Sequence, residues 1–480
     1  MSGVTNSRSG RIAAAVAVLA TLSLAGCVTP QVEEPRGKTL DAQSLGLTGQ
    51  IVAPPGEQWW TAFGDPQLNA LVDDATRNAP SLSQALSRVR GAQAQAMVAS
   101  AGRKPGFTVD ADETWQRFSE NYIYPPPFGG GHYWMGQALA NMNWNLDFWG
   151  RQAALIDQSR SQLSASVLDV ASARLALAGA IAQAYVDLYR SWQLIDIATR
   201  QEQQRQQLLK LTQQRVAAGL DTKIELKVAE SALPQARYAR LQAESARELA
   251  VHRLAALAGY GADRYAQIGR PRLTLDTALP LPEQLPMDLL AHRPDVLAAR
   301  ARIDAATAGR KAAHAAFYPD ISLRAFAGTQ AIDLDNLVKG GSVVYGVGPA
   351  LHLPIFNAEG LRAAYKNATA ELDASVASYN ATVLDAVRET ADQISLNESY
   401  GRQLEQVQQT LQAASTAYEL AKKRYAVGLS TQLVVLDAES RVLDAQRALL
   451  TANTQRVIAR VTLLLMLGGS FDPAAPAEGV

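Results

Sequence analysis

The sequence is poor in several residue types, and each shortage argues against a class of protein. A single cysteine, Cys27, leaves no partner for an intrachain disulfide and no cysteine-based metal site. Lysine plus arginine total 45 and aspartate plus glutamate total 45 in 480 residues, so the chain lacks the positive charge of a typical nucleic-acid binder. Only 6% of residues are aromatic. After residue 24, no continuous apolar run reaches the ~20 residues of a membrane-spanning helix.

The N-terminus has the pattern of a secretory signal that ends at the single cysteine. Arg8 and Arg11 precede the apolar run 12–24, and small residues follow it. Residues 24–27 (Leu-Ala-Gly-Cys) resemble the bacterial lipoprotein box. We therefore predict a signal peptide over 1–26, with diacylglycerol and palmitoyl groups on Cys27; an incidental thiol is the alternative. By the same resemblance, Val28 favours the outer membrane, because an aspartate at that position is linked to inner-membrane retention.

The rest of the chain repeats itself. Pro80 and Pro105 recur as Pro294 and Pro319 at an offset of 214, and Arg-Val-Ala-Ala-Gly-Leu at 215–220 recurs as Arg-Tyr-Ala-Val-Gly-Leu at 424–429 at an offset of 209. These agreeing offsets predict two similar halves, 58–259 and 286–469, joined by a linker over 260–285. Outside them we expect a tether over 27–57 and a disordered tail over 470–480.

Each half is predicted to contain one very long helix that ends in a tight turn. Proline is absent from 151–218 and from 361–427, and apolar residues recur in both at helical spacing. We expect long helices over 149–218 and 358–427, each on the order of 100 Å long, which implies packing as a coiled coil or a tube. Gly219 and Gly428 fit helix caps with positive φ, so each helix turns back on itself at a tip.

Two segments in each half alternate between apolar and polar residues. On the apolar side, Trp115, Trp134 and Trp144 alternate with aspartate, asparagine, glutamine and threonine. Alternation over about ten residues is the signature of membrane β-strands, with a soluble amphipathic hairpin as the alternative. We predict strands at 107–118, 132–147, 320–330 and 342–354. Six of the seven tryptophans lie within 59–149, as expected for anchors at a membrane interface.

Four strands cannot close a barrel, and lipid does not tolerate an open sheet edge. Two chains would give eight strands, but the interior of such a barrel is filled by side chains and could not conduct. Three chains would give twelve. Oligomerisation is therefore a physical requirement if these strands lie in a membrane.

Several motifs bear on the family: the lipoprotein box, the paired halves, the two Arg-x-x-x-Gly-Leu tips, and residues 143–151 (Asn-Trp-Asn-Leu-Asp-Phe-Trp-Gly-Arg), 293–296 (Arg-Pro-Asp-Val) and 317–320 (Phe-Tyr-Pro-Asp). Together they resemble the TolC-type outer-membrane efflux proteins, in the lipidated branch that partners resistance-nodulation-division pumps. The resemblance covers 58–469. It implies a mainly α fold with a transmembrane β part: a homotrimer with a 12-stranded β-barrel continuous with a 12-helix periplasmic α-barrel. Each protomer would give four strands and long helices. The implied partners are a periplasmic adaptor protein, an inner-membrane pump and outer-membrane lipid.

The resemblance also implies a narrow periplasmic aperture at the second tip. Matching motifs place Tyr425, Leu433 and Asp437 there. Three copies of an aspartate would favour cations, and a leucine ring could gate by dewetting; the alternative is that Asp437 simply faces water. The family often carries an arginine where this chain has Ala426, which argues against a complete latch between subunits. The first half has Val228 where the second has Asp437, so we expect only the second tip to line the pore.

No catalytic or metal-binding motif stands out. The five histidines are scattered, and the sequence has no Gly-x-Ser-x-Gly motif. Arg293, Pro294 and Asp295 are interpreted as a helix start. We expect a passive duct in the outer membrane that extends into the periplasm and exports drugs or other small toxic molecules. A type I protein secretion duct and a non-conducting envelope lipoprotein are the alternatives. We expect no enzyme activity, no metal, no cofactor beyond the lipid, and no nucleic-acid partner.

Overall fold

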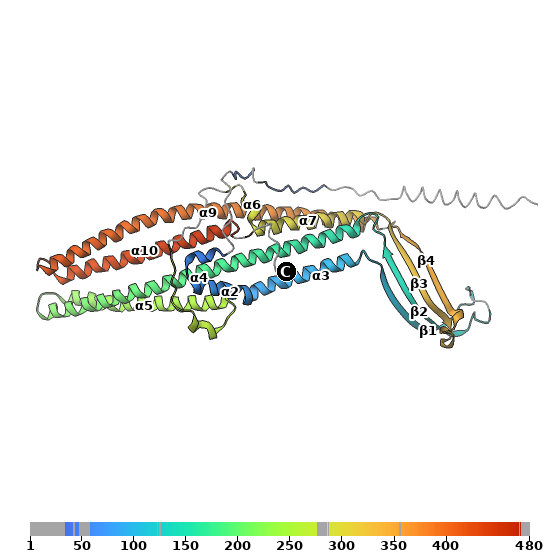
Figure 1. The fold of residues 1–480 in the computed structure, drawn as a ribbon, viewed down its shortest axis with the longest axis horizontal. Coiled ribbons are helices and arrows are strands. Elements are labelled where there is room, and N and C mark those ends of the chain that lie inside the picture. Colours follow the sequence, from blue (N-terminus) through green and yellow to red (C-terminus); the bar gives the residue numbers. More distant parts are fainter. Residues whose placement is uncertain are drawn as a thin grey trace, which may run out of the picture. The chain divides into compact units, whose positions relative to one another are not determined.

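The computed structural model describes residues 34–41, 44–47, 58–121, 123, 126–275, 286, 288–354, 357–469 and 471. The predicted signal peptide and Cys27 lie outside these residues, as do 276–285 of the linker and most of the tail. The helices, labelled as in Figure 1, are α2 (Pro66–Asn78), α3 (Pro80–Ala101), α4 (Arg151–Ala217), α5 (Lys223–Leu257), α6 (Leu289–His292), α7 (Pro294–Ala315), α8 (Leu334–Leu337), α9 (Ala358–Ala426) and α10 (Gln432–Met466), with short 3-10 turns η1 (Trp59–Phe63), η2 (Ala262–Gln267) and η3 (Gly340–Ser342).

The chain divides into two compact units that both halves build together. Among the described residues, the first unit comprises those within 34–39, 90–165 and 299–379, and it contains the sheet. The second comprises the described residues within 40–89, 166–298 and 380–471, and it contains both tips. Because α4 and α9 are long, each contributes residues to both units. The mainly α fold with a small β part is the fold class expected from the sequence.

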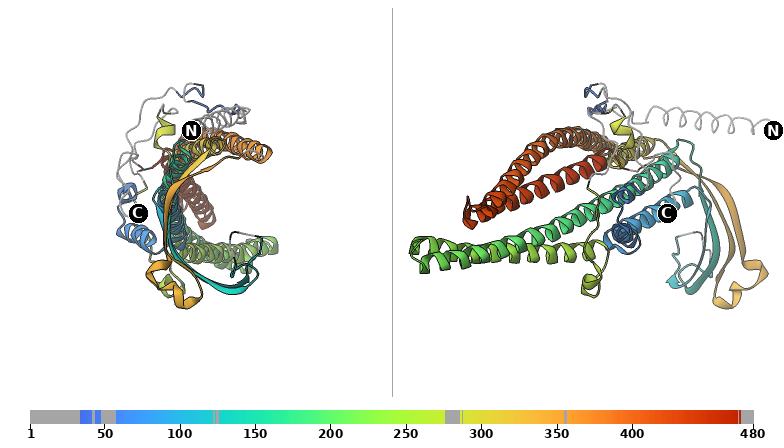
Figure 2. Two further views of the ribbon diagram at one scale, coloured as in Figure 1. Left: turned by 90° about the vertical axis from the view of Figure 1, so that its right-hand side faces the viewer. Right: turned by 60° about the vertical axis from the view of Figure 1, so that its left-hand side comes forward.

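Four antiparallel strands form one sheet in the first unit: β1 (Gly106–Arg117), β2 (His132–Asn145), β3 (Asp320–Ile332) and β4 (Val343–His352). They are ordered β1-β2-β3-β4, and they lie side by side in one curved sheet (Figures 1 and 2). The hairpins of the two halves thus meet where β2 pairs with β3.

The register of the sheet separates its two faces. Directly paired residues share a face, and Val109 pairs with Ala140, Ala140 with Ala327, and Ala327 with Tyr345. The strands therefore place their apolar residues on one continuous face. On the other face, Asp112 accepts a hydrogen bond from Gln137 at 2.7 Å. The alternation in the sequence thus corresponds to one apolar and one polar surface.

Two long helical hairpins make up most of the second unit. The helices α4 and α9 contain 67 and 69 residues, and the returning helices α5 and α10 contain 35 each. At a rise of 1.5 Å per residue, α4 and α9 are each on the order of 100 Å long. Figure 1 shows α5 running back beside α4 and α10 running back beside α9. The proline-free runs of the sequence therefore correspond to uninterrupted helices.

A buried cluster holds the middle of α4 in the second unit. Ile181, Tyr185 and Leu188 are fully buried among residues of η1, α2, α5 and α10. The Tyr185 hydroxyl donates to Asp65 Oδ2 at 2.7 Å and accepts from Gln67 Nε2 at 2.8 Å. Burial and the neighbouring Asp65 carboxylate raise the pKa of Tyr185, so its hydroxyl stays protonated and keeps donating.

The composition of α4 bears on the expectation that no continuous apolar run after residue 24 is long enough to span a membrane. By length and composition, one stretch of α4 is apolar enough to cross a membrane. A core helix of a soluble protein can have the same composition, so a single stretch of this kind does not by itself indicate a membrane span. The same helix supplies Ile181, Tyr185 and Leu188 to the buried cluster, and 33% of the apolar stretch is buried inside the protein.

The structure sets element boundaries that differ by a few residues from those expected. The second strand ends at Asn145 rather than at 147, and α4 begins at Arg151 rather than at 149. The Asp147 carboxylate is the reason, because it accepts from the backbone N–H groups of Gln152 and Ala153 at 2.9 and 2.8 Å. An aspartate that caps a helix cannot also continue a strand. The remaining strands and long helices begin and end within two residues of the expected positions.

Candidate gate at the second helical turn

The two tips share one backbone geometry. Gly219 and Gly428 have φ of 74° and 78°, a region that side chains disfavour. At the second tip the Gly428 N–H donates to the Tyr425 carbonyl at 3.0 Å, and the Leu429 N–H donates to the Arg424 carbonyl at 2.8 Å. The first tip repeats both bonds at 3.0 and 2.8 Å. This is the cap that reverses a helix within a few residues.

Side chains add two further ties at the first tip. Arg215 Nε and Nη2 donate to the two Asp221 oxygens at 2.7 and 2.8 Å. Thr222 caps α5 in a capping box, in which Glu225 accepts from the Thr222 N–H at 3.0 Å. Hydrogen bonding by Arg215 lowers the pKa of Asp221, and hydrogen bonding by Thr222 lowers the pKa of Glu225. The first tip is therefore stabilised by side-chain hydrogen bonds in addition to its backbone hydrogen bonds.

The second tip lacks both ties. At the offset of 209, Ser430 replaces Asp221 and Val434 replaces Glu225. Thr431 is the N-cap of α10, but its side chain makes no capping hydrogen bond. Arg424, which corresponds to Arg215, instead donates to the Leu429 carbonyl at 3.4 Å. This difference between the tips is visible in the sequence. The repeat alone does not show that Asp221 and Glu225 stabilise the first tip through side-chain hydrogen bonds.

The three residues expected at the aperture flank the second turn. Tyr425 lies in the last turn of α9 with 47% of its surface exposed. Leu433 and Asp437 lie four residues apart in α10, so they share one face, and both are exposed. No hydrogen bond joins Tyr425 to Asp437 in this described part of the chain. The aperture residues are thus available to neighbouring molecules rather than bound to one another.

A different stripe of α10 fixes the helix against α4. Leu436 and Ser440 are buried. Gln204 donates to the Leu436 carbonyl, and Arg205 Nη2 donates to Ser440 Oγ at 2.8 Å. Because these contacts face α4, they leave the Leu433–Asp437 stripe uncovered.

Arg441 changes the electrostatics of the expected acidic ring. Its guanidinium lies 3.1 Å from Asp437 Oδ2, one helical turn away, and both side chains are mostly exposed. An exposed pair of this kind contributes at most ~1 kcal/mol, yet it offsets the negative charge of the aspartate locally. The Asp-x-x-x-Arg spacing is visible in the sequence and could have revealed this partner.

A second carboxylate lies nearby. Burial raises the pKa of Glu439, and the charges of Arg200 and Lys422 partly oppose that shift. Burial also raises the pKa of Tyr418, with Glu439 adding to the effect. A partly buried acid with a raised pKa therefore lies on α10, in addition to the exposed Asp437.

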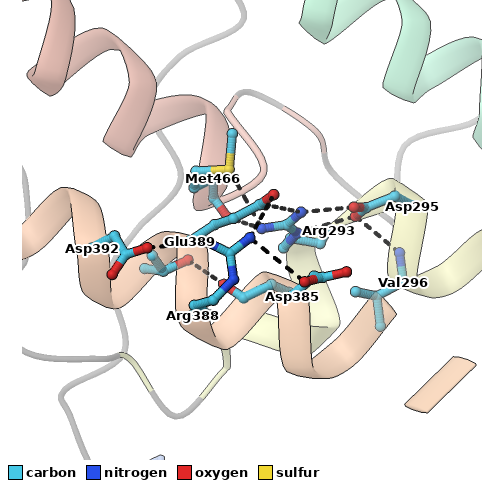
Figure 3. Close-up of polar contacts among 10 residues, drawn as sticks. Arg293, Asp295, Val296, Asp385, Arg388, Glu389, Asp392 and Met466 are labelled. Atoms are coloured by element: carbon cyan, nitrogen blue, oxygen red, sulfur yellow. Dashed lines mark hydrogen bonds and ion pairs between the residues drawn. The ribbon is translucent and has the colours of Figure 1, made fainter. Parts of the chain in front are cut away.

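A polar cluster ties three helices of the second unit at the start of α7. Arg293, with its side chain only 9% exposed, donates to Asp295 Oδ2 at 2.7 Å and to Glu389 Oε2 at 3.4 Å. It also donates to the Met466 carbonyl at the end of α10 at 3.3 Å (Figure 3). Burial favours a lower pKa for Arg293, but the two carboxylates outweigh it and the pKa is raised. The helix does begin at Pro294, as expected, but the sequence did not predict that the arginine is buried.

Within the described ranges, no group of three or more histidine, cysteine, aspartate or glutamate residues could hold a metal ion. The geometry described above is that of a long-helix hairpin pair with an exposed turn, joined to a sheet with one apolar face.

Comparisons with known proteins place this geometry in a family. The chain matches the family described as outer membrane efflux protein over 71–260 and 285–469. It belongs to the outer membrane efflux protein family. The outer membrane protein OprJ of Pseudomonas aeruginosa is 32% identical over 471 residues, covering 95% of each chain. The fusaric acid resistance protein FusA of Burkholderia cepacia is 35% identical over 362 residues, covering 73% of this chain and 68% of its own.

A solved structure agrees with these relatives. The outer membrane protein VceC of Vibrio cholerae superposes with a TM-score of 0.80 at 34% identity, covering 88% of this chain and all of that one. The chain is thus a TolC-like outer membrane efflux protein, and it works at the outer membrane as the channel component of an efflux system.

Proposed function

We propose that three copies of this chain form a passive duct through the outer membrane. The observation that carries the proposal is the four-stranded sheet, whose apolar face is continuous and whose β1 and β4 lie at its two edges. Lipid requires those edges to be paired, and three chains pair them by joining β4 of one to β1 of the next. Twelve strands leave room for a lumen, lined by the polar face that carries Asp112 and Gln137.

The second tip is the gate in this proposal. Three copies of Leu433 and Asp437 surround the axis, with Tyr425 beside the turn. This tip is the one that opens, because it lacks the Arg215–Asp221 ion pair and the capping box of the first. Since Ala426 replaces the arginine that the family often has, closure relies on packing around the axis rather than on a full latch between subunits.

The driving force comes from partners in this proposal. A periplasmic adaptor contacts the tips, where Leu220, Ile224 and Leu429 are each about two-thirds exposed or more. A resistance-nodulation-division pump in the inner membrane supplies energy and selects the cargo, and the chain itself performs no chemistry. The cargo class is small toxic molecules, which agrees with the name of the fusaric acid resistance relative.

The N-terminus adds a covalent anchor in this proposal, through diacylglycerol and palmitoyl groups on Cys27. Mass spectrometry of the mature N-terminal peptide tests it, with Cys27→Ser as the control. A mature chain that begins at Cys27 without lipid would refute the anchor and leave the duct untouched.

Single-channel conductance of the purified protein in a planar bilayer tests the duct and the gate. We expect discrete openings, with weaker cation preference for Asp437→Ala. Arg441→Ala should strengthen cation preference, because it leaves Asp437 unpaired, and the double variant should behave like Asp437→Ala. Glu405→Ala, an exposed acid of α9 remote from the turn, serves as control. A chain that stays silent even after the gate is weakened would refute the duct.

Introducing the side-chain contacts of the first tip into the second tip tests which tip moves. The double variant Ser430→Asp with Val434→Glu recreates the ion pair and the capping box at the second tip. We expect a several-fold lower open probability, whereas Ser430→Ala should leave it unchanged. An unchanged open probability in the double variant would show that the turn does not limit opening.

Two other functions predict different results in a deletion strain. A protein secretion duct predicts normal drug susceptibility with loss of secreted proteins. An envelope spacer without a pore predicts neither change, and the apolar sheet face speaks against it. Increased susceptibility with unchanged secretion supports efflux.

A further inference from the structure

A pocket in the first unit has no place in the duct mechanism. It has a volume of about 570 Å³ and lies among the start of α4, the end of α7, α9 and the segment at 34–35. That segment is held beside the pocket, because the N–H groups of Arg36 and Gly37 both donate to Asp373 Oδ1 at 2.9 Å. The volume falls in the range of small-molecule sites.

The pocket carries charges of both signs. Arg310 and Lys311 contribute positive charge, and Glu34 and Asp157 contribute negative charge. The Arg310 guanidinium lies 5.1 Å above the Tyr365 ring and donates to Thr369 Oγ1 at 3.2 Å, so its position is fixed.

The other three charged side chains have no internal partner. Lys311, Glu34 and Asp157 form no ion pair or side-chain hydrogen bond with any residue that the structure describes, and all three are exposed. Two acids and a lysine that line one pocket without neutralising each other suit a ligand that carries both charges.

Aromatic residues indicate that the pocket lies level with the ends of the strands. Trp149 lines the pocket, stacks on Tyr318 at 4.9 Å and donates from Nε1 to the Pro319 carbonyl at 2.8 Å. Both rings lie next to strand ends, since β2 ends at Asn145 and β3 begins at Asp320. Such aromatic residues mark the level of lipid headgroups.

The length of β2 agrees with that level. Ten residues separate Trp134 from Trp144 near the two ends of the strand. At ~3.4 Å per residue and a tilt of ~45°, they span about 24 Å, close to the ~25 Å apolar band of an outer-membrane barrel. The pocket begins where this band ends.

We propose that the pocket binds the headgroup of a zwitterionic phospholipid that carries a phosphodiester and a primary ammonium. The phosphate lies between Arg310 and Lys311, the ammonium between Glu34 and Asp157, and the glycerol beside Trp149. This inference rests on the proposed function, because it needs the strands to lie in the membrane. A purely anionic headgroup fits less well, since both carboxylates would repel it.

Native mass spectrometry of the delipidated full chain tests the site. The protein is titrated with phospholipids that share acyl chains and differ only in an ethanolamine, choline or glycerol headgroup. We expect the ethanolamine lipid to bind about threefold to tenfold more tightly than the glycerol lipid, the range of one partly exposed charge-assisted hydrogen bond. The choline lipid should also bind more weakly, because its ammonium has no N–H donor.

Two variants separate the charges. Lys311→Gln should weaken binding of all three lipids, whereas Asp157→Asn should weaken the ethanolamine lipid most, the choline lipid less and the glycerol lipid not at all. Lys366→Gln, an exposed lysine of α9 outside the pocket lining, is the matched control. Equal affinity for ethanolamine and glycerol lipids, or equal effects of Lys311→Gln and Lys366→Gln, would overturn the proposal.

Two further measurements identify the source of any failure. Glycerophosphoethanolamine should displace the bound lipid at lower concentration than inorganic phosphate, and equal potency would reduce the site to a simple anion site and overturn the proposal. Conductance is recorded on the same preparations. Normal conductance without lipid selectivity refutes only the lipid site, whereas protein that stays silent even after the gate is weakened refutes the duct itself.

Discussion

Replacing Arg293 by methionine should loosen the tie among α7, α9 and α10. Methionine keeps most of the volume of the aliphatic stem but removes every hydrogen bond of the guanidinium. Those bonds reach Asp295, Glu389 and the Met466 carbonyl at 2.7, 3.4 and 3.3 Å. The carbonyl belongs to the last residue of α10, where a helix has no internal donor left to satisfy it.

The size of the effect follows from burial. Breaking a fully buried ion pair costs ~3–5 kcal/mol, and an exposed pair contributes ~0–1 kcal/mol. Arg293 is 9% exposed, but the side chains of Asp295 and Glu389 are 40% and 37% exposed, so water can solvate them once the arginine is gone. We therefore expect a loss of about 2 kcal/mol, between these limits. For a chain of 480 residues, that lowers the unfolding midpoint by about 2 °C.

Thermal unfolding of the detergent-solubilised protein, followed by circular dichroism at one scan rate, measures the change. Arg300→Met is the matched control, because Arg300 is an exposed residue of the same helix. Arg293→Lys should fall between wild type and methionine, since lysine keeps the charge but loses the bidentate fork. If the midpoints of Arg293→Met and Arg300→Met coincide, the cluster does not hold the three helices together.

Three other predictions concern the same unit. Tyr185→Phe removes the donor to the buried Asp65 and should cost about 1–2 kcal/mol in unfolding free energy, whereas Tyr189→Phe should change little. Gly428→Ala should lower the unfolding free energy by about 1 kcal/mol, because alanine disfavours a φ of 78°. Gly401→Ala, inside α9, should raise the unfolding free energy by about 0.5–1 kcal/mol, because alanine favours a helix more than glycine does. Calorimetry measures both changes. The pKa of Asp221 is lowered, so its stabilisation is present above the ordinary aspartate range and lost as pH falls through the folded-state value. Hydrogen exchange corrected for intrinsic rate should therefore rise more at the first tip than at the second on acidification.

The strands and long helices were predictable because each has a simple period. Alternation at 107–116 and 134–147 is enough to separate an apolar from a polar face. The strand order β1-β2-β3-β4 and the pairing register then bring the four apolar faces together. Uninterrupted helices followed from the absence of proline and from helical spacing. The turns followed from Gly219 and Gly428, the residue type that accepts a positive φ.

Tertiary contacts account for what the sequence did not predict. Arg293 looks like a residue before a helix start, and only the packing of α9 and α10 around it makes it buried. The pocket beside Trp149 joins residues that are more than a hundred positions apart, so no local pattern points to it. Arg441 is different, because its spacing from Asp437 is local and could have been noticed.

The repeat accounts for the difference between a fixed first tip and an opening second tip in the proposed gate. Both halves inherit the same backbone turn, with matching bonds at Gly219 and Gly428, so the turn itself cannot distinguish them. Two substitutions at the offset of 209 do so, because Ser430 and Val434 remove an ion pair and a capping box without disturbing the glycine cap. A duplicated hairpin can therefore become a gate when one copy loses the side-chain contacts that stabilise its turn. In the proposed gate, the first tip stays fixed while the second tip opens.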